Sequence, residues 1–256
     1  MLRKRLGQHH LRDSALCRPL VEYLDPAGWR VIEIGPGGGV LTEALLAAGA
    51  RVTAWELDRD WTFEMARRFA SESRLRLVNA DALTLPWERI TSPFKVAGNL
   101  PYNVATVLID RMLDHGTRIA RAAFMVQLEV AQRLVADPGT KAYGAASVLT
   151  AARAQARILA HVRPGSFIPA PKVESAFVGL EPRREAPTPS ELDELRSLVF
   201  AAFGQRRKTL RNSLATRWPR PRVEVAIEQA GLRPDVRAEQ LSCAEFGELL
   251  NQLHAV

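Results

Sequence analysis

The sequence is poor in cysteine and has no long uncharged apolar run. Its 256 residues include two cysteines, Cys17 and Cys243, and neither belongs to a CxxC motif or a cysteine–histidine cluster. This excludes a disulfide framework and gives no pattern typical of a zinc site. No run approaches the roughly 18 apolar residues of a membrane span, and the basic N-terminus lacks the apolar core of a secretory signal. We therefore expect a cytoplasmic protein with no metal and no membrane anchor.

Acidic residues are missing from one stretch near the C-terminus. Between Phe203 and Arg222 there are seven arginine and lysine residues and no aspartate or glutamate, so this basic window carries a charge equal to the whole net charge of +7. A second basic cluster lies within the first 12 residues. Two such clusters in an otherwise neutral chain favour an anionic partner such as nucleic acid over simple solvated faces.

Short segments rich in valine, isoleucine and leucine alternate with helical patterns over the first two thirds of the chain. We expect strands at 29–35, 50–57, 75–81, 94–100 and 121–128, and helices at 41–49 and 59–71. This alternation predicts βαβ units and a mostly parallel, doubly wound α/β sheet. Because ligands of such sheets bind beyond the carboxyl ends of the strands, the residues that follow each strand are the candidate site.

A proline-rich segment at 180–194 has mixed charges and few apolar residues, which indicates a linker. It predicts one larger α/β domain over residues 1–186 and a smaller all-helical domain over residues 187–256. Four segments beyond the linker have helical spacing, and Ser242 with Glu245 forms the pattern of a capping box.

The first predicted strand is followed by glycines at alternate positions. Glu33, Gly35, Gly37 and Gly39 stand at alternate positions, and glycines in such a turn let a ligand approach the backbone closely. The dinucleotide pattern G-x-G-x-x-G would place its last glycine at Val40, which disfavours a pyrophosphate ligand. The alternate spacing resembles the first motif of class I S-adenosylmethionine-dependent methyltransferases.

Acidic residues close the next two strands. Glu56 lies 21 residues after Gly35, where a carboxylate can accept hydrogen bonds from ribose hydroxyls. Asp81 ends the third strand, where a carboxylate can accept from the amino group of an adenine. Together with the glycine turn, these strand ends predict a nucleoside pocket for S-adenosylmethionine.

The fourth strand ends in an unusual cluster, Asn-Leu-Pro-Tyr. It resembles the Asn/Asp-x-Pro-Tyr/Phe signature of methyltransferases that modify the exocyclic nitrogen of a base. An adenine N6 is a weak nucleophile, and the Asn99 side-chain oxygen and the Leu100 carbonyl are placed to accept its hydrogens. We expect Pro101 to fix the turn and Tyr102 to stack on the base. We expect Phe167 to supply a second wall, because stacking offsets the cost of extruding a base.

Nine segments of the sequence together resemble one protein family. They are KRLGQHHL, EIGPGGGVLTEAL, ELDRD, NADAL, GNLPYNVAT, QLEVAQRLVADPGTKAYGAASVL, FIPAPKVESAFV, FGQRRKTLRNSL and RAEQLS. These strings cover nearly the whole chain and resemble the small-subunit ribosomal RNA adenine N6,N6-dimethyltransferases, the kasugamycin-sensitivity family. The resemblance implies a Rossmann-like catalytic domain, a helical RNA-binding domain, and a monomer acting on small-subunit rRNA in the immature small ribosomal subunit. Two neighbouring adenosines would each receive two methyl groups.

The resemblance also implies roles for individual residues. By motif, the cofactor contacts carry over to His9, Leu11, Gly35, Glu56, Asp81 and Asn99, and the target site to Asn99, Leu100, Tyr102 and Phe167. From the residues themselves we also expect Gly37 to contact the cofactor, Pro101 to belong to the target site, and Arg206, Arg207, Lys208 and Arg211 of the basic window to bind RNA. His9 stands where the family has an asparagine. An imidazole can still donate to the methionine carboxylate, so we expect cofactor binding to persist, with a pH dependence near neutrality.

Two other functions remain open. One is methylation of large-subunit rRNA by a macrolide-resistance methyltransferase, which shares the fold and a similar target motif. The other is a ribosome-assembly factor whose binding role dominates over catalysis. The strings QRRKTLRNSL and KAYG favour the small-subunit family.

Overall fold

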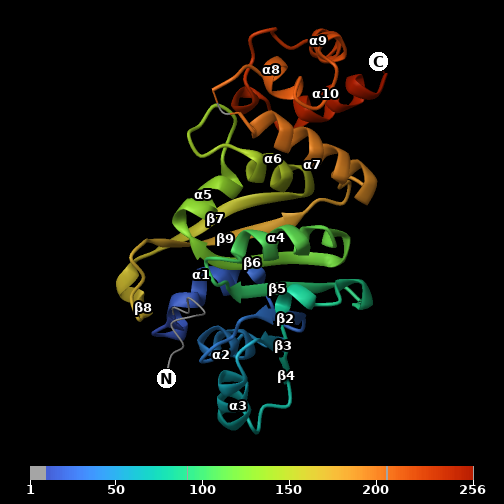
Figure 1. Ribbon diagram of the computed structural model, residues 1–256. Coiled ribbons are helices and arrows are strands. Elements are labelled where there is room, and N and C mark those ends of the chain that lie inside the picture. The colour runs from blue at the N-terminus through green and yellow to red at the C-terminus, as the bar shows by residue number, and fades with distance from the viewer. Residues whose placement is uncertain (1–9, 91, 206, 256) are drawn as a thin grey trace. The chain divides into compact units, whose positions relative to one another are not determined.

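The computed structural model describes residues 10–90, 92–205 and 207–255, which form two compact units (Figure 1). Unit 1 comprises Met1–Ala131 and Ala154–Arg184, and unit 2 comprises Gln132–Arg153 and Glu185–Val256. The chain re-enters unit 2 close to the boundary predicted near residue 186. However, the prediction placed Gln132–Arg153 in the first domain, and the structure groups it with the C-terminal helices. The reason is apolar packing, since Val148 and Leu149 are buried in the core of unit 2.

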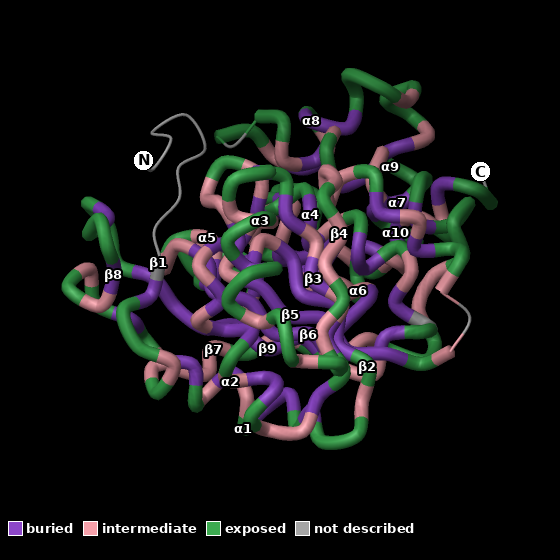
Figure 2. The backbone as a smooth tube through the Cα atoms, turned by 90° about the horizontal axis from the view of Figure 1, so that it is seen from below, coloured by how far each residue is buried: buried purple, intermediate pink, exposed green. Residues whose placement is uncertain are grey.

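Unit 1 is built on a seven-stranded sheet of order β4-β3-β2-β5-β6-β9-β7. The strands are β2 (Arg30–Ile34), β3 (Arg51–Glu56), β4 (Leu75–Asn79), β5 (Phe94–Asn99), β6 (Ile119–Gln127), β7 (Ala154–Val162) and β9 (Ser175–Pro182). The pairs from β4 to β6 are parallel, and β9 is antiparallel to both β6 and β7. The predicted doubly wound, mostly parallel sheet is therefore confirmed. The central strands are buried along nearly their whole length (Figure 2).

The helices of unit 1 connect these strands. They are α1 (Arg18–Leu24), α2 (Val40–Ala47), α3 (Arg59–Arg68) and α4 (Ala105–Leu113), while α5 (Leu128–Val135) begins in unit 1 and ends in unit 2. Short 3-10 turns lie at η2 (Ser14–Cys17), η3 (Ala82–Thr84), η4 (Trp87–Arg89), η5 (Gly116–Arg118) and η6 (Pro164–Ser166). Helices α1 and α2 bury their apolar residues against one face of the sheet, where Leu20, Leu45 and Met125 are fully buried in one cluster.

A second, two-stranded sheet ties the N-terminal segment to a later loop. Strand β1 (His10–Leu11) pairs antiparallel with β8 (Phe167–Ile168), with Leu11 opposite Phe167. The backbone N–H of Arg12 extends this pairing by donating to the Ser166 carbonyl at 3.0 Å. This pairing holds the start of the described chain against the loop that precedes β9.

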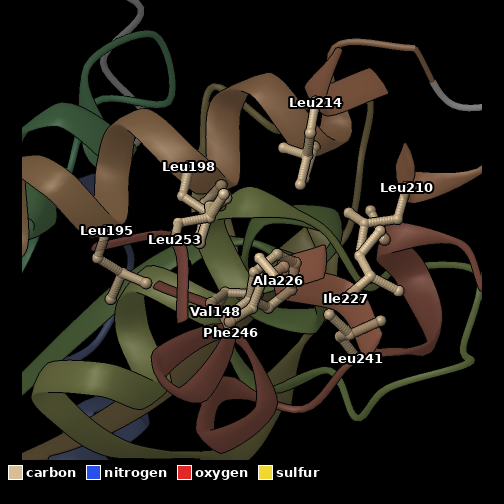
Figure 3. Packing of buried hydrophobic residues seen from close by; sticks show 14 of the residues in the cluster. Val148, Leu195, Leu198, Leu210, Leu214, Ala226, Ile227, Leu241, Phe246 and Leu253 are labelled. Carbon is tan, nitrogen blue, oxygen red and sulfur yellow. The ribbon is translucent and has the colours of Figure 1, made fainter. Parts of the chain in front are cut away.

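Unit 2 is helical within its described residues. Its helices are α6 (Ala145–Arg153), α7 (Pro189–Phe203), α8 (Leu210–Leu214), α9 (Arg220–Gln229) and α10 (Cys243–Ala255), with a 3-10 turn η7 at Ala238–Gln240. Their apolar faces meet in one core around Leu198 and Phe246 (Figure 3). The predicted capping box is confirmed, since Ser242 N–H donates to the Glu245 carboxylate at 2.7 Å and Glu245 N–H donates to Ser242 Oγ at 3.2 Å.

Gly98, in the middle of the sheet, offers a test of this packing. A Cβ at Gly98 would lie 2.6 Å from the Ile34 carbonyl oxygen, and a backbone atom in a paired strand cannot move aside. We expect Gly98→Ala to lower the free energy of unfolding by about 2 kcal/mol, measured by urea denaturation. Gly165→Ala is the control, since a Cβ there meets no atom within 4 Å. Equal effects of the two substitutions would contradict the close approach.

Candidate functional site

The loop after β2 has a backbone that only glycine adopts readily. Gly35, Gly37 and Gly39 have φ of +68°, +50° and +82°, in the left-handed region that other residues avoid. Space is also restricted at Gly39, where a Cβ would lie 2.5 Å from Met65 Sδ. The loop therefore turns tightly from the end of β2 into α2.

Glu56, the last residue of β3, holds this glycine loop. Its carboxylate is buried and accepts hydrogen bonds from Gly37 N–H (Oε2, 3.0 Å) and from Asp58 N–H (Oε1, 2.8 Å). Burial raises the pKa of Glu56, and these backbone hydrogen bonds act in the opposite direction. A carboxylate has about four acceptor positions, so it keeps capacity for further donors.

Asp81 lies next to Glu56 along the same edge of the sheet. The Glu56 carbonyl accepts from Ala80 N–H at 3.1 Å, directly before Asp81. One oxygen of Asp81, Oδ1, accepts from Leu83 N–H at 2.8 Å and caps η3. This hydrogen bond fixes the carboxylate at the end of β4.

A small pocket lies beside the glycine loop. It is lined by Leu11, Glu33, Gly35, Pro36, Gly38, Val40, Leu41 and Asn99. Three residues predicted to contact the cofactor, Leu11, Gly35 and Asn99, thus meet in one place, although they come from β1, the loop after β2 and the end of β5. His9, also predicted to contact the cofactor, lies outside the described residues.

Glu33 is a residue of this pocket to which the sequence analysis gave no role. It is fully buried, and its Oε2 accepts from Thr42 Oγ1 at 2.7 Å, while its buried Oε1 has no partner within the described part of the chain. Burial raises the pKa of Glu33 to about 8. Its place two residues before the first glycine of the motif was the signal that could have marked it.

The raised pKa of Glu33 predicts a pH-dependent stability. Its pKa lies at about 8 in the folded protein, above the ordinary value of 4.5, so between these values the folded state holds a proton that the unfolded state releases. Stability is therefore expected to fall as the pH rises from about 5 to 8. Glu33→Gln removes this titration, so the stability of the variant should not fall in the same way. Between pH 5 and 8, the unfolding free energy of the parent should therefore decrease by a few kcal/mol relative to that of the variant, at about 1.4 kcal/mol per pKa unit.

Urea denaturation at several pH values measures this difference. Glu64→Gln is the matched control, because Glu64 is exposed on α3 and its replacement should leave the pH profile unchanged. Parallel profiles for the parent and Glu33→Gln would contradict the assignment.

The Asn-Leu-Pro-Tyr cluster begins with the last residue of β5, at the same edge of the sheet. Leu100 N–H donates to the Met125 carbonyl at 3.1 Å, and the Pro101 carbonyl accepts from Val104 N–H at 3.1 Å and Ala105 N–H at 3.0 Å, which starts α4. In contrast, the Leu100 carbonyl receives no hydrogen bond from the described residues. The Pro101 carbonyl is therefore occupied by hydrogen bonds within the turn, whereas the Leu100 carbonyl can accept a hydrogen bond from a ligand.

Tyr102 is fixed by a residue that the sequence analysis did not single out. Its hydroxyl and Ser175 Oγ share a hydrogen bond of 2.6 Å, and Ser175 is fully buried at the start of β9. Burial raises the pKa of the Tyr102 phenol. The ring is therefore anchored at its polar end, and the string KVESAF, which contains Ser175, was the only sequence signal for this partner.

Comparisons with known proteins agree on one family. A model of that family, described as ribosomal RNA adenine dimethylase, matches residues 1–255. The chain belongs to this family. A relative from Methylococcus capsulatus, named ribosomal RNA small subunit methyltransferase A, is 43% identical over 98% of both chains. A relative of the same name from Pseudomonas aeruginosa is 41% identical over 98% of this chain and 94% of its own.

Solved structures agree with the fold of this dimethylase. The 23S rRNA methyltransferase ErmE aligns over 95% of this chain and 99% of its own, with a TM-score of 0.75 and 27% identity. A dimethyladenosine transferase from Plasmodium falciparum aligns over 96% of this chain and 98% of its own, with a TM-score of 0.83 and 23% identity. The predicted class I methyltransferase fold is confirmed, and the methyl donor of the dimethylase is S-adenosylmethionine, as in its family.

Phe167 differs from its predicted role. We expected its ring to form an open wall for a base, but the structure buries it completely, in a cluster with Leu11, Leu20 and Phe177. The cause is the β1–β8 pairing, which places Phe167 opposite Leu11 and turns the ring into the core. In this structure of the dimethylase the ring has no face open to a base, so Tyr102 is the remaining predicted stacking residue.

The basic window is only partly open to a partner. Arg207 and Lys208 are exposed, and Arg206 lies outside the described residues. Other arginines of the window serve the helical unit itself: Arg211 and Arg220 pair with Glu224 at 3.4 and 3.1 Å, and Arg222 donates to the Leu253 carbonyl. The acid that neutralises part of this charge lies just beyond the window.

Proposed function

We propose that this dimethylase transfers methyl groups from S-adenosylmethionine to N6 of two adjacent adenosines in small-subunit rRNA, two methyl groups to each. The observation that carries the proposal is the position of Asn99. It lines the pocket beside the glycine loop and also begins the Asn-Leu-Pro-Tyr turn, so a group held by this turn lies next to a ligand of the pocket. The relatives named small-subunit methyltransferase A, at 43% and 41% identity, support the small subunit over the large one, since ErmE is 27% identical.

The residues at this edge fit the proposed donor. Glu56 accepts from the ribose hydroxyls with the acceptor positions that Gly37 and Asp58 leave available, and Asp81 accepts from the adenine amino group with its second oxygen. Leu11, Val40 and Leu41 give the pocket apolar walls beside the glycine backbone. When bound, the donor supplies a methyl group activated on a sulfonium. The chain itself contributes position and electrostatics.

The target site acts on the amino group of the extruded adenine. The Asn99 side-chain oxygen and the Leu100 carbonyl accept the two N6 hydrogens, which concentrates the nitrogen lone pair toward the methyl group. Tyr102 stacks on the base, and its hydrogen bond to Ser175 limits the movement of the ring. The reaction requires no general base, because the methylated amine becomes cationic and acidic and loses its proton to water.

We further propose that unit 2 binds the RNA backbone, with Arg207 and Lys208 as exposed contacts and with Arg206 and Arg211 beside them in the sequence. The substrate is the immature small subunit in the cytoplasm, and the dimethylase acts on it as a monomer. None of the helices in the described ranges is long and apolar enough to cross a membrane.

Charge reversal tests the RNA-binding role of unit 2. Arg207→Glu with Lys208→Glu is expected to weaken subunit binding about tenfold and to reduce the salt dependence of binding by roughly one phosphate contact per residue. Fluorescence anisotropy between 50 and 200 mM salt measures both quantities. Arg183→Glu with Arg184→Glu makes the same charge change on exposed residues outside the basic window and should have little effect. Equal losses in the two variants would refute a specific role.

Product identity tests the function itself. The protein is incubated with isotopically labelled S-adenosylmethionine and, separately, with unmethylated small subunits, bare small-subunit rRNA or large subunits, and the nucleosides are identified by mass spectrometry. Dimethyladenosine in the small subunits supports the proposal. Dimethyladenosine confined to large subunits would favour the activity in the name of ErmE, and tight subunit binding without product would favour an assembly factor.

A further inference from the structure

A second and larger cavity lies in unit 1, outside the site described above. This lateral groove, with a volume of about 850 Å³, is lined by residues of two segments, Ser14–Val21 and Ala160–Ser166, together with Ala44 and Phe177. A volume of this size accommodates a nucleotide-sized group. None of the described residues assigned to the cofactor and target sites lines it.

The charge of the lateral groove has one sign. Arg18, His161 and Arg163 line it and are exposed, whereas the described residues along its walls include no aspartate or glutamate. Arg18 forms an ion pair with Glu22 at 3.7 Å, but both side chains are more than two thirds exposed, at 79% and 69%, and such pairs contribute little. Arg18 can therefore exchange this partner for a phosphate at small cost.

The lining of the groove also suits a nucleic-acid strand. Ser14 and Ser166, which carry hydroxyl groups, and the apolar Val162 and Phe177 are among the residues that line the groove. Hydroxyl and guanidinium groups donate to phosphate oxygens, and apolar surface accommodates sugars and bases. This combination fits a sugar–phosphate backbone better than a free inorganic anion, which needs no apolar lining.

The β1–β8 pairing places the groove beside the cofactor pocket. Leu11 lines the pocket, and Ser14, three residues later, lines the groove, so the two Cα atoms are at most about 11 Å apart. Ser166, the residue before β8, also lines the groove, and its carbonyl accepts from Arg12 N–H. The next residue, Phe167, pairs with Leu11. Since β9 is antiparallel to both β7 and β6, β7 runs in the same direction as β6. Val162, at the end of β7, therefore lies at the same edge of the sheet as the end of β6.

We propose that the lateral groove binds the backbone of the RNA strand that carries the target adenosine, with Arg18 and Arg163 contacting its phosphates. The proposal rests on the proposed function for the identity of the strand. It assigns to unit 1 an RNA contact separate from the basic window of unit 2. Such a contact would align the strand as it enters the target site, since phosphate contacts fix register and orientation.

The test measures binding of unmethylated small subunits as a function of salt. In Arg18→Ala with Arg163→Ala, loss of two phosphate contacts is expected to reduce the slope of log affinity against log salt by about 1.4 and to weaken binding about tenfold at 100 mM salt. The melting temperature and the affinity for S-adenosylmethionine should stay unchanged, since both side chains are exposed. Arg51→Ala with Arg76→Ala is the control, because it removes the same charge from exposed residues of β3 and β4.

A gain of charge tests the same contact in the opposite direction. Ala160 lines the groove, and Ala160→Lys is expected to steepen the salt dependence by roughly 0.7 and to tighten binding. An unchanged slope in both groove variants would overturn the proposal. An equal loss of affinity in the Arg51 and Arg76 control would also overturn it, as would a loss of affinity accompanied by a lower melting temperature.

The product assay separates this proposal from the proposed function. If the parent protein forms dimethyladenosine in small subunits while the groove variants bind as it does, the groove proposal fails and the function stands. If the parent forms no dimethyladenosine but the groove variants shift the salt dependence as expected, the function fails and the groove remains an RNA contact.

Discussion

Replacing Asn99 with alanine is expected to lower the rate of methyl transfer to small subunits about 10³-fold. The substitution removes one of the two acceptors that hold the N6 hydrogens, and loss of a single such contact in other enzymes costs about 10²–10³ in rate. The Leu100 carbonyl stays in place, because Leu100 N–H remains bound to the Met125 carbonyl. The residual activity should therefore exceed the uncatalysed reaction.

Single-turnover methylation with saturating subunits measures this rate. Asn99→Asp retains a side-chain oxygen in the same position and should keep a larger part of the activity, while Asn251→Ala, on an exposed position of α10, should have none of the effect. Subunit affinity should change little, and the affinity for S-adenosylmethionine less than tenfold, since Asn99 is one of several residues in the pocket. A normal rate for Asn99→Ala would show that the proposed chemistry is wrong.

Local patterns predicted where the candidate site residues lie in the fold, because the fold is regular there. In a parallel sheet the carboxyl ends of adjacent strands meet at one edge, so the glycine motif, Glu56, Asp81 and Asn99 were expected together from their places after successive strands. The structure has these strands as β2, β3, β4 and β5, in the order β4-β3-β2-β5.

Features that depend on long-range pairing were not predictable from local patterns. The burial of Phe167 follows from its pairing with Leu11, 156 positions earlier in the chain, and the anchoring of Tyr102 follows from a hydrogen bond to Ser175 on another strand. Gln132–Arg153 likewise carries an ordinary helical pattern. Only packing against the core of unit 2 decides to which unit it belongs.

The charge of the basic window likewise depends on a contact that local patterns do not reveal. Counting residues gave the window its full positive charge, but Glu224, which lies outside it, forms ion pairs with Arg211 and Arg220 across turns of unit 2. The exposed charge of Arg207 and Lys208 is therefore a better guide to the RNA contact than the sum over the window. This is why the charge reversal proposed above uses these two residues.

Glu56→Ala is expected to weaken binding of S-adenosylmethionine by about 10²–10³-fold. Two effects add. The ribose loses a charged acceptor, which is worth about 1.5–3 kcal/mol, and Gly37 N–H and Asp58 N–H lose the partner that fixes the glycine loop. Glu56→Gln should have a smaller effect, because the amide keeps one acceptor oxygen, although its NH₂ group then faces one of these two backbone donors.

Isothermal titration calorimetry of the free protein measures the dissociation constant without relying on activity. Glu64→Ala, on the exposed face of α3, is the control and should bind like the parent. Burial raises the pKa of Glu56, so protonation on acidification should weaken binding in the parent at a higher pH than an exposed glutamate would require, whereas the affinity of Glu56→Ala should lack this step. An alanine variant that binds as tightly as the parent would show that the carboxylate at the end of β3 only braces the loop, and the ribose would then need another acceptor at this edge of the sheet.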